Sequence, residues 1–389
     1  MDIKKREINE SRLLEIAQGL IKLPTVNPPG DEALVAEYLS TLFLNEGFTS
    51  SIDWIDKNRA NFVTWVEGEK PGPTLVFTGH MDVVNATGEW KKPPFDACIE
   101  GTRLYGRGSA DMKGAIASMV EAAMTFYEND KLNCGRLMLA FVADEELSNK
   151  GTISFLKQYK NLDYAVLGEP TELEIAYAHR GCATFKLTTH GLAGHASEPS
   201  IGINAILLML PIVQAIEKYN EFISKRNYGS LPAPTATVNV IKGGEKFNII
   251  PDRCEIIIDR RLLPSEDLIS VKGELIEVIH DAVKASVCKD FSLEMVSFCS
   301  PGELSLQSDF LSKSISVFSK CFGTKPHVKE FRASCEQSYF LDQGVETIIC
   351  GPGSISQAHV VDEYIEISEM SRAAELYLAL CEEILIKEE

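Results

Sequence analysis

The sequence lacks any long uninterrupted apolar run. No stretch reaches the roughly 18 consecutive apolar residues that a membrane-spanning helix needs. The first ten residues carry positive charge, but Glu7 and Glu10 interrupt it, and no apolar segment of the signal-peptide type follows. We therefore expect no membrane association and a location in the cytoplasm.

Basic residues are few relative to acidic ones. The chain has 38 lysines and arginines against 56 aspartates and glutamates, which gives a formal net charge of −18 at pH 7. Such a charge repels phosphate groups, so nucleic acid and anionic membranes are not expected partners. The charge favours solubility and a small cationic or zwitterionic substrate.

Paired cysteine motifs are also absent. Ten cysteines are scattered from Cys98 to Cys381 without a Cys-x-x-Cys pair. In a reducing compartment this pattern indicates small core residues rather than disulfide partners. We assign no cysteine to a metal.

The two ends of the chain have an alternating strand and helix pattern. Apolar residues recur at helical spacing over 10–21, and runs typical of buried strands occupy 74–78, 136–143 and 164–167. A long helix is expected between them, over 109–127. This alternation predicts an α/β fold with a mixed, mostly parallel sheet flanked by helices, in which ligand sites lie beyond the carboxyl ends of the strands.

The middle of the chain has a different pattern of short alternating strands and two helices. With 389 residues and 45% apolar content, the chain is long enough for two cores. We expect a catalytic domain formed by 1–180 and 291–389. A small α+β domain over 181–290 would be inserted in it.

A histidine and an aspartate follow the first of the predicted buried strands. His80 and Asp82 lie two residues apart on one side of an extended segment, so Asp82 could accept from the ring nitrogen that His80 does not use on a metal. An ordinary loop histidine is the alternative for His80. Asp111 could likewise be a helix-capping residue, and only its neighbours make it a ligand.

Acidic residues follow the other two strands. Asp144-Glu145-Glu146 could be a solvated turn, but two adjacent glutamates can also divide tasks, one binding metal and the other taking a proton from water. Glu169 ends its strand before a proline, which keeps the backbone extended. With His359 as a second imidazole, the set predicts a hydrolytic two-metal site.

Other motifs are weaker. Gly106-Arg-Gly108 could begin a dinucleotide-binding loop, but Asp111 takes the third glycine position and no evident strand precedes the motif directly. The remaining histidines of the chain, apart from His195, are expected on the surface. They are His179, His190, His280 and His327.

Taken together, the motifs resemble those of the family that contains acetylornithine deacetylase, succinyl-diaminopimelate desuccinylase, glutamate carboxypeptidase and aminoacylase. The resemblance spans most of the chain, and the order and spacing of its segments make it specific. The segments are Asn27-Pro-Pro-Gly30, Gly79-His-Met-Asp-Val-Val84, Gly106 to Gly114, Asp144-Glu-Glu146, Gly168-Glu-Pro170, Gly194-His-Ala-Ser197, Gly351-Pro-Gly-Ser354 and Gln357 to Tyr364.

The resemblance implies two Zn²⁺ per chain, with Co²⁺ as a substitute. Asp111 would bridge the ions, and a cis peptide would join it to Met112. Glu145 would be the general base and Asp82 would orient His80. The remaining ligands would be His80 and Glu169 for one ion, and Glu146 and His359 for the other.

The resemblance also implies a homodimer, with the inserted domain as a lid and dimerisation domain. His195 would reach the partner subunit's active site and polarise the scissile carbonyl, although a plain loop histidine is the alternative. Asn248 and Arg261 match residues that contact the substrate's carboxylate. Gly353 would lie in a tight loop of the substrate pocket.

Among the activities of this family, we expect removal of the acyl group from an N-acyl amino acid. The segment 351–364, together with Glu336 in 335–340, is closest to acetylornithine deacetylases, so N2-acetyl-L-ornithine in arginine biosynthesis ranks first. The serine-, threonine- and glycine-rich segment expected of desuccinylases is missing. Succinyl-diaminopimelate desuccinylase, dipeptidase or carboxypeptidase activity is the alternative, and a non-catalytic metal-binding regulator is the alternative of another class.

Overall fold

The computed structural model divides into two compact units. The larger is built from both ends of the chain and the smaller from its middle. The residues described are 7–129, 132–284 and 290–386, so the charged start of the chain up to residue 6 lies outside them. The larger unit takes 1–178, 303–331 and 335–389, and the smaller takes 179–302 and 332–334.

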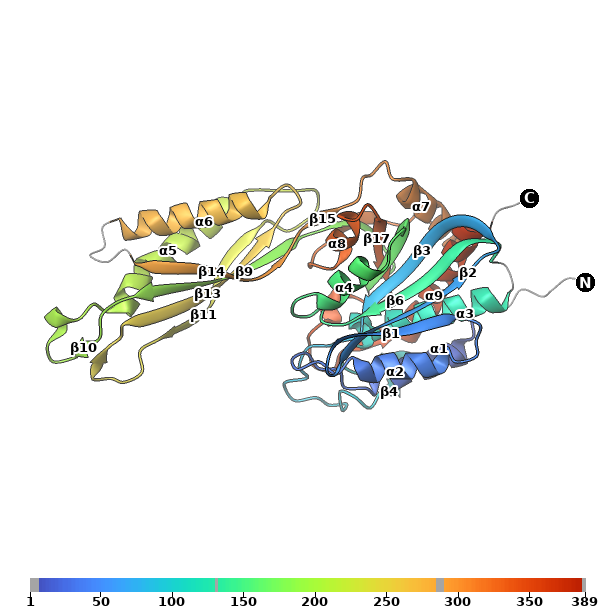
Figure 1. Cartoon of the computed structure of the whole chain (residues 1–389), viewed down its shortest axis with the longest axis horizontal. Coiled ribbons are helices and arrows are strands. Elements are labelled where there is room, and N and C mark those ends of the chain that lie inside the picture. Colours follow the sequence, from blue (N-terminus) through green and yellow to red (C-terminus); the bar gives the residue numbers. More distant parts are fainter. Residues whose placement is uncertain (1–6, 130–131, 285–289, 387–389) are drawn as a thin grey trace, which may run out of the picture. The chain divides into compact units, whose positions relative to one another are not determined.

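A nine-stranded sheet forms the centre of the larger unit (Figure 1). Its four middle strands β6, β3, β7 and β17 run parallel, and antiparallel strands flank them on both sides. In sheet order the strands are β1 (Thr49–Asp56), β2 (Arg59–Glu67), β6 (Cys134–Val142), β3 (Lys70–His80), β7 (Tyr164–Pro170), β17 (Glu346–Gly351), β8 (Ile175–His179) and β15 (Gly302–Glu303), with β16 (Val328–Phe331) paired to β8. The expected mostly parallel sheet is confirmed.

Both faces of the parallel strands are buried, which explains their continuous apolar runs. On β3, Leu75 and Phe77 face one core and Val76 faces the other. The first core also contains helices α1 (Glu10–Ile21), α2 (Ala33–Leu42), α3 (Gly114–Glu128), α7 (Asp309–Phe322) and α9 (Ile367–Leu385). The second contains α4 (Lys150–Gln158) and α8 (Gln337–Leu341).

The helix expected over 109–127 is interrupted near its start. Ser109–Lys113 forms a wide turn in which Asp111 and Met112 have non-helical backbone angles, and α3 begins only at Gly114. The peptide bond between Asp111 and Met112 is cis, as the resemblance implied. Asp111 therefore lies in an irregular segment before the helix and does not cap a regular helical turn.

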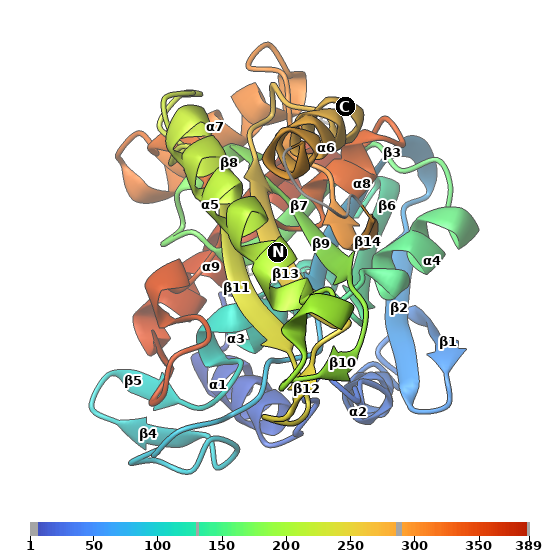
Figure 2. The same cartoon turned by 90° about the vertical axis from the view of Figure 1, so that its left-hand side faces the viewer.

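The smaller unit has a four-stranded antiparallel sheet. Helices α5 (Ala205–Ile223) and α6 (Leu268–Val283) lie side by side against it, as Figure 2 shows, and share its core. The strand order is β11 (Thr235–Gly243), β13 (Arg253–Leu262), β9 (Gly181–His190) and β14 (Phe291–Cys299). A short pair, β10 (Gly194–His195) with β12 (Ile249–Ile250), stands apart from this sheet.

The expected domain boundary at residue 290 is wrong. Strand β14 pairs with β9, and Phe291 and Leu293 pack against the core of the smaller unit. These apolar contacts keep the strand in the smaller unit, which extends to Gly302.

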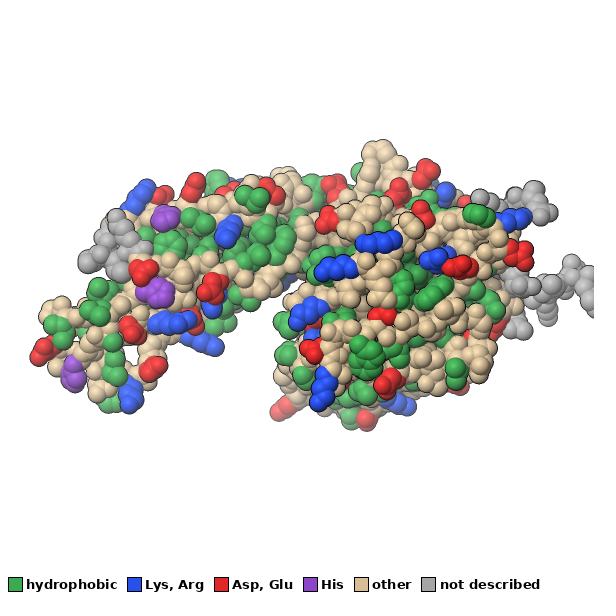
Figure 3. All heavy atoms as spheres, in the orientation of Figure 1, with side chains coloured by type: hydrophobic (Ala, Val, Ile, Leu, Met, Phe, Trp, Pro, Cys, Tyr) green, Lys and Arg blue, Asp and Glu red, His purple; other side chains and the backbone are tan. Residues whose placement is uncertain are grey.

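The distribution of surface charge and the burial of the cysteines bear on what the composition predicts. On the face drawn in Figure 3, basic side chains are scattered among acidic ones in each unit. Within the described ranges, no helix is long and apolar enough to cross a membrane. Of the nine cysteines described, five are buried as expected, and Cys321 is exposed, contrary to expectation. The buried ones are Cys134, Cys254, Cys335, Cys350 and Cys381.

Candidate metal centre

Three parallel strands bring acidic and imidazole side chains to one edge of the sheet. His80 is the last residue of β3, Glu169 lies near the end of β7, and Asp144-Glu145-Glu146 follow β6. Because parallel strands present their carboxyl ends at the same edge, residues far apart in the sequence become neighbours there. His80 and Glu169 are 1% and 4% exposed, so the edge is well shielded from solvent.

Asp111 lies between two imidazoles. Its Oδ1 is 3.0 Å from His80 Nε2, and its Oδ2 is 3.4 Å from His359 Nε2. His359 Nε2 is also 3.2 Å from the carboxylate of Glu146, and His80 Nε2 is 3.8 Å from Glu169 Oε1. All five predicted ligands therefore meet, with the Asp111 carboxylate at their centre.

The His80 ring is oriented by Asp82, though not through the expected atom. His80 Nδ1 donates to the main-chain carbonyl of Asp82 at 2.9 Å, whereas the Asp82 carboxylate is 3.8 Å away. That carboxylate accepts instead from the backbone N–H groups of Glu145 and Glu146, at 3.1 and 3.2 Å. Asp82 thus aims the imidazole with its backbone and holds the glutamate turn with its side chain.

The pKa values show a site with excess negative charge. Burial raises the pKa of Glu145 well above its usual range, and although His80 opposes this, the charge of Glu169 adds to it. Burial also raises the pKa of Asp111, but hydrogen bonds from His359 and His80 outweigh it, so the pKa is lowered. Hydrogen bonds to Asp111 and Glu146 raise the pKa of His359 to about 10. Bound cations would relieve this crowding of carboxylates.

The donor set fits divalent transition metals. Ligand atoms of His80, Asp111 and Glu146 all lie within 4.8 Å of one another. Imidazole nitrogen and carboxylate oxygen are donors that zinc accepts, and a carboxylate with an imidazole on each side can be shared by two ions.

A buried polar network supports the turn after β6, and the sequence patterns did not identify most of it. Arg59 donates to Asp144 at 2.8 Å and to Glu32 at 3.0 Å. Asn27 donates to Asp144 at 3.0 Å and to Asp82 at 2.8 Å. Asn27 lies in one of the motifs that carry the resemblance, but Arg59 and Glu32 have no local signal that could have identified them.

Gly353 lies beside the centre in the larger unit. Its backbone has φ 86°, a left-handed value that favours glycine, and its N–H donates to Glu369 Oε2 at 2.7 Å. A Cβ at this position would lie 3.3 Å from the Cβ of Ala110, the residue before Asp111. The glycine thus lets its loop lie close against the segment that carries Asp111.

The other predicted site residues lie in the smaller unit, at two separate places. His195 in β10 pairs with Ile249 of β12, and the N–H of Ala196 donates to the carbonyl of Asn248 at 3.0 Å, so His195 and Asn248 are neighbours. Arg261 lies near the far end of β13 and is not brought to them. The side chain of Arg261 is 34% exposed, and its Nε donates to Asp259 Oδ1 at 2.9 Å.

Burial excludes Arg260 as a residue that contacts the substrate. It is fully buried and pairs with Glu266 at 2.7 Å. Of the two adjacent arginines, only Arg261 has a partly exposed side chain, because successive residues of a strand face opposite sides.

His179 contradicts the expected surface position. It is fully buried, its Nδ1 donates to the carbonyl of Arg180 at 2.9 Å, and burial lowers its pKa to about 4. It is the last residue of β8. His280 and His327 are exposed, and His190 is partly buried.

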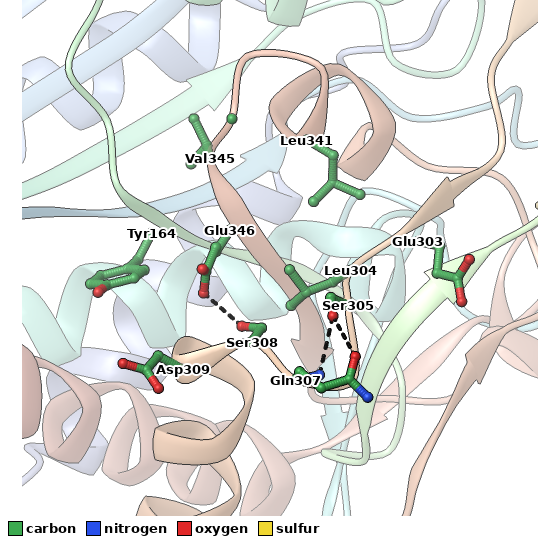
Figure 4. Close-up of a pocket in the computed structure, with 11 residues that line it drawn as sticks. Tyr164, Glu303, Leu304, Ser305, Gln307, Ser308, Asp309, Leu341, Val345 and Glu346 are labelled. Atoms are coloured by element: carbon green, nitrogen blue, oxygen red, sulfur yellow. Dashed lines mark hydrogen bonds between the residues drawn. The ribbon is translucent and has the colours of Figure 1, made fainter.

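A cavity of about 650 Å³ lies at the opposite edge of the sheet (Figure 4). Tyr164 and Glu346, the first residues of β7 and β17, line it together with the start of α7. Glu346 Oε2 accepts from Ser308 Oγ at 2.6 Å and from the N–H of Phe310 at 3.1 Å. This carboxylate is engaged in holding the helix start, and the cavity is separate from the metal centre.

Comparison with known proteins identifies the family of the chain. The sequence matches the profile of peptidase family M20/M25/M40 over residues 76–383. The chain belongs to this family. It is an M20 metallohydrolase, an enzyme that hydrolyses amide bonds. Enzymes of this family depend on metal, and the donor set of His80, Asp111 and Glu146 fits a metal ion.

Two curated relatives align with this M20 chain over nearly its whole length. A probable succinyl-diaminopimelate desuccinylase of Staphylococcus aureus (strain N315) is 30% identical over 393 residues, which cover 92% of this chain and 94% of the relative. An acetylornithine deacetylase of Pectobacterium carotovorum subsp. carotovorum (strain PC1) is 30% identical over 393 residues, which cover 95% and 97%. The resemblance inferred from the motifs is confirmed.

Solved structures of M20 proteins share the fold. An M20 family metallo-carboxypeptidase of Sulfolobus solfataricus has a TM-score of 0.79 at 20% identity, covering 96% of this chain and 99% of its own. A dinuclear metal-binding peptidase of the family from Bacillus subtilis has a TM-score of 0.72 at 12% identity, covering 97% and 98%. The expected α/β architecture is confirmed.

Proposed function

We propose that the chain removes the acyl group from an N-acyl amino acid, and that N2-acetyl-L-ornithine is its first candidate substrate, with L-ornithine and acetate as products. The observation that carries this is the position of Asp111 between two imidazoles, with Glu145 beside them. A shared carboxylate with a neighbouring base is the arrangement of a two-metal hydrolase.

The residues divide into two ligand sets around the shared Asp111. His80 and Glu169 would hold one Zn²⁺, and Glu146 and His359 the other, with Co²⁺ as a substitute. When bound, the ions supply Lewis-acid polarisation of the amide carbonyl and lower the pKa of water. Glu145 takes the proton of the attacking water and passes it to the leaving amine.

His195 is prepared to donate a hydrogen bond to the developing oxyanion. The N–H of Ser197 lies 3.2 Å from His195 Nδ1, and Ser197 Oγ lies 2.6 Å from the same atom. When Nδ1 accepts these bonds, the neutral ring carries its hydrogen on Nε2. His195 is exposed, and Nε2 is therefore a donor available to a substrate. A positioned donor of this kind stabilises a tetrahedral oxyanion.

The distance between the two substrate-binding places of the smaller unit favours a homodimer. Arg253 begins β13, close in sequence to β12, and Arg261 lies near its other end. Eight residues of extended strand span roughly 26 Å, at about 3.3 Å each. An acylated amino acid is much shorter than this strand, which supports binding of one substrate by residues of two chains. We propose that Arg261 serves one active site while His195 and Asn248 serve the partner subunit's.

Arginine side chains support a substrate with a carboxylate. Besides Arg261, Arg180 lies in the smaller unit, and its Nε donates to the carbonyl of Arg332 at 2.8 Å. The charge of Arg261 and that of Arg332 contribute to lowering the pKa of Arg180, although burial is the main cause. Guanidinium groups that repel one another in this way are relieved by a bound carboxylate.

The choice between acyl groups depends on finer features. The segment 351–364 and the buried Glu336, which accepts from Thr152 Oγ1 at 2.8 Å, favour acetylornithine. Relatives named for deacetylation and for desuccinylation are equally similar to the chain, so succinyl-diaminopimelate is the second candidate and dipeptides the third. Arginine biosynthesis in the cytoplasm would be the setting of the first candidate.

The test combines metal content, mass in solution and substrate choice. Zinc-reconstituted protein should contain about two ions per chain by elemental analysis and should have the mass of a dimer by light scattering. Hydrolysis should then be measured on N2-acetyl-L-ornithine, N-succinyl-diaminopimelate and a dipeptide panel. Absence of bound metal would overturn the proposal, whereas faster turnover of the succinyl compound would replace only the first candidate substrate.

A further inference from the structure

Glu363 is a buried carboxylate that contacts the segment carrying Asp111. It lies four residues after His359 and directly before strand β18 (Tyr364–Glu366), and it is fully buried. Each of its two oxygens accepts two hydrogen bonds, so all of its acceptor positions are occupied. The donors are Arg107 Nη1 at 2.6 Å and Gly108 N at 3.1 Å on Oε2, and Ala110 N at 2.9 Å and Asp111 N at 3.1 Å on Oε1.

These bonds account for the irregular backbone around Asp111. In a regular helix, the first N–H groups would be capped locally, and later ones would bond within the helix. Here Gly108 is left-handed, Asp111 is at φ −124° and ψ 89°, and three N–H groups of the turn point at one distant carboxylate. Without Glu363 these buried N–H groups would lose their acceptor, which is costly.

The hydrogen bond from Asp111 N to Glu363 also links the shared ligand Asp111 to the segment that carries the ligand His359. Asp111 and Glu363 are 252 positions apart in sequence, and His359 is on the same short segment as Glu363. Strand β18 continues from Glu363 and pairs with β5 (Arg103–Tyr105), which precedes the Asp111 turn. Movement of either segment would therefore change the distance between Asp111 and His359.

We propose that Glu363 is a positioning residue that holds the Asp111 turn so that the carboxylate faces both imidazoles, which makes the two metal sites form together. The proposal rests on the two-metal function proposed above. It assigns to Glu363 a task that neither its burial alone nor its ion pair with Arg107 would require.

The test is the binding of Co²⁺ to metal-free protein, followed by elemental analysis and by the visible ligand-field bands of the bound ion. Glu363→Gln keeps the shape of the side chain but turns an NH₂ group toward donors. Loss of an outer partner of a ligand typically lowers metal affinity by about 10–100-fold. We expect that loss for both ions, with altered band positions because Asp111 is displaced.

Glu366→Gln is the matched control. Glu366 is three residues further on, at the end of β18, and accepts from Thr102 Oγ1 and Arg103 Nε, both at 2.7 Å, with its side chain 29% exposed. It makes no contact with the Asp111 turn among the described hydrogen bonds, so this variant should bind two Co²⁺ ions as the wild type does.

Two further variants separate the backbone contact from the ion pair. Arg107→Lys leaves the three N–H bonds of Glu363 in place and should bind Co²⁺ as the wild type does. Glu363→Asp keeps the charge but is one carbon shorter, so it should fold and still bind Co²⁺ about 10–100-fold more weakly. If near-UV circular dichroism shows that Glu363→Gln does not fold, Glu363→Asp tests the role of this side chain.

The outcomes distinguish this proposal from the proposed function. If the wild type binds no metal, the two-metal function fails. If the wild type binds two ions and both Glu363 variants match its affinity and spectrum, the positioning role is overturned while the function stands. A loss in Arg107→Lys as large as that in the Glu363 variants would assign the effect to the ion pair and also overturn it.

Discussion

The carboxylate of Asp82 accepts the backbone N–H of Glu145 at 3.1 Å. Its other oxygen accepts the N–H of Glu146 at 3.2 Å, so one side chain sets the position of two adjacent glutamates with different proposed tasks. The same residue orients His80 through its main-chain carbonyl. A substitution of the Asp82 side chain should therefore disturb the glutamates while leaving the imidazole contact intact.

Asp82→Asn should lower both turnover and metal affinity by about 10–100-fold, the usual effect of losing an outer partner of a ligand. The asparagine amide can accept only one of the two N–H groups, and its NH₂ repels the other. Turnover and zinc content would be measured together. Asp56→Asn, at the exposed end of β1 where Asp56 accepts the N–H of Lys57 at 2.8 Å, should change neither. Unaltered zinc content in Asp82→Asn would contradict the positioning of Glu146.

Substitutions of Glu145 and Glu146 should have different effects. Glu145→Gln should retain two metal ions and lose on the order of 10²–10⁴ in turnover, the scale of a general base. Glu146→Gln should lose the ion that it shares with His359. Elemental analysis and turnover number distinguish the two, and a Glu145→Gln enzyme with wild-type turnover would remove Glu145 from the mechanism.

Active sites completed by two chains should show complementation. His195→Ala should remain dimeric and metal-loaded while losing about 10²–10³ in turnover, and Glu145→Ala should be inactive for a separate reason. Mixing the two under subunit exchange should restore part of the activity, because one site of each mixed dimer has both native residues. Exchange is followed by mass spectrometry of differently tagged chains, and mixed dimers as inactive as their parents would refute the trans arrangement.

The buried His179 should make the stability of the protein dependent on pH. Because its pKa is about 4 in the folded chain and 6.5 ordinarily, the unfolded chain binds the proton first as pH falls. Stability is unaffected above pH 6.5 and declines as pH falls toward 4, by about 3 kcal/mol at most. His179→Asn keeps a donor for the carbonyl of Arg180 and does not titrate. Urea unfolding midpoints of wild type and variant should diverge across this window, and parallel curves would show that His179 does not contribute.

Apolar periodicity predicted some of the elements in the core of the larger unit, but not the buried strands β2 and β17. The helix expected over 10–21 is α1, and the three expected buried strands are β3, β6 and β7. Strand β1 was not predicted, since it is a polar edge strand with little burial and carries neither a continuous apolar run nor a clean alternation. Periodicity reports burial, so edges of sheets are where it is weakest.

Motifs predicted the residues that meet at the metal centre, but not what holds them. Ligands ending neighbouring strands could be inferred because strand ends share an edge. The interruption of the helix at Asp111 could not be inferred from local sequence. The backbone there depends on Glu363, a residue 252 positions away.

Strand β17 (Glu346–Gly351) lies inside the sheet, between β7 and β8, although among the described strands of this sheet it is the last to be made. A nascent chain that has not reached Glu346 has an open edge on β7, which is buried in the complete sheet, and it lacks His359 as well. Open strand edges are templates for aggregation. Ribosomes that stop early would thus release aggregation-prone chains without a complete metal site, so we expect the production of this enzyme to depend on protection of the unfinished chain.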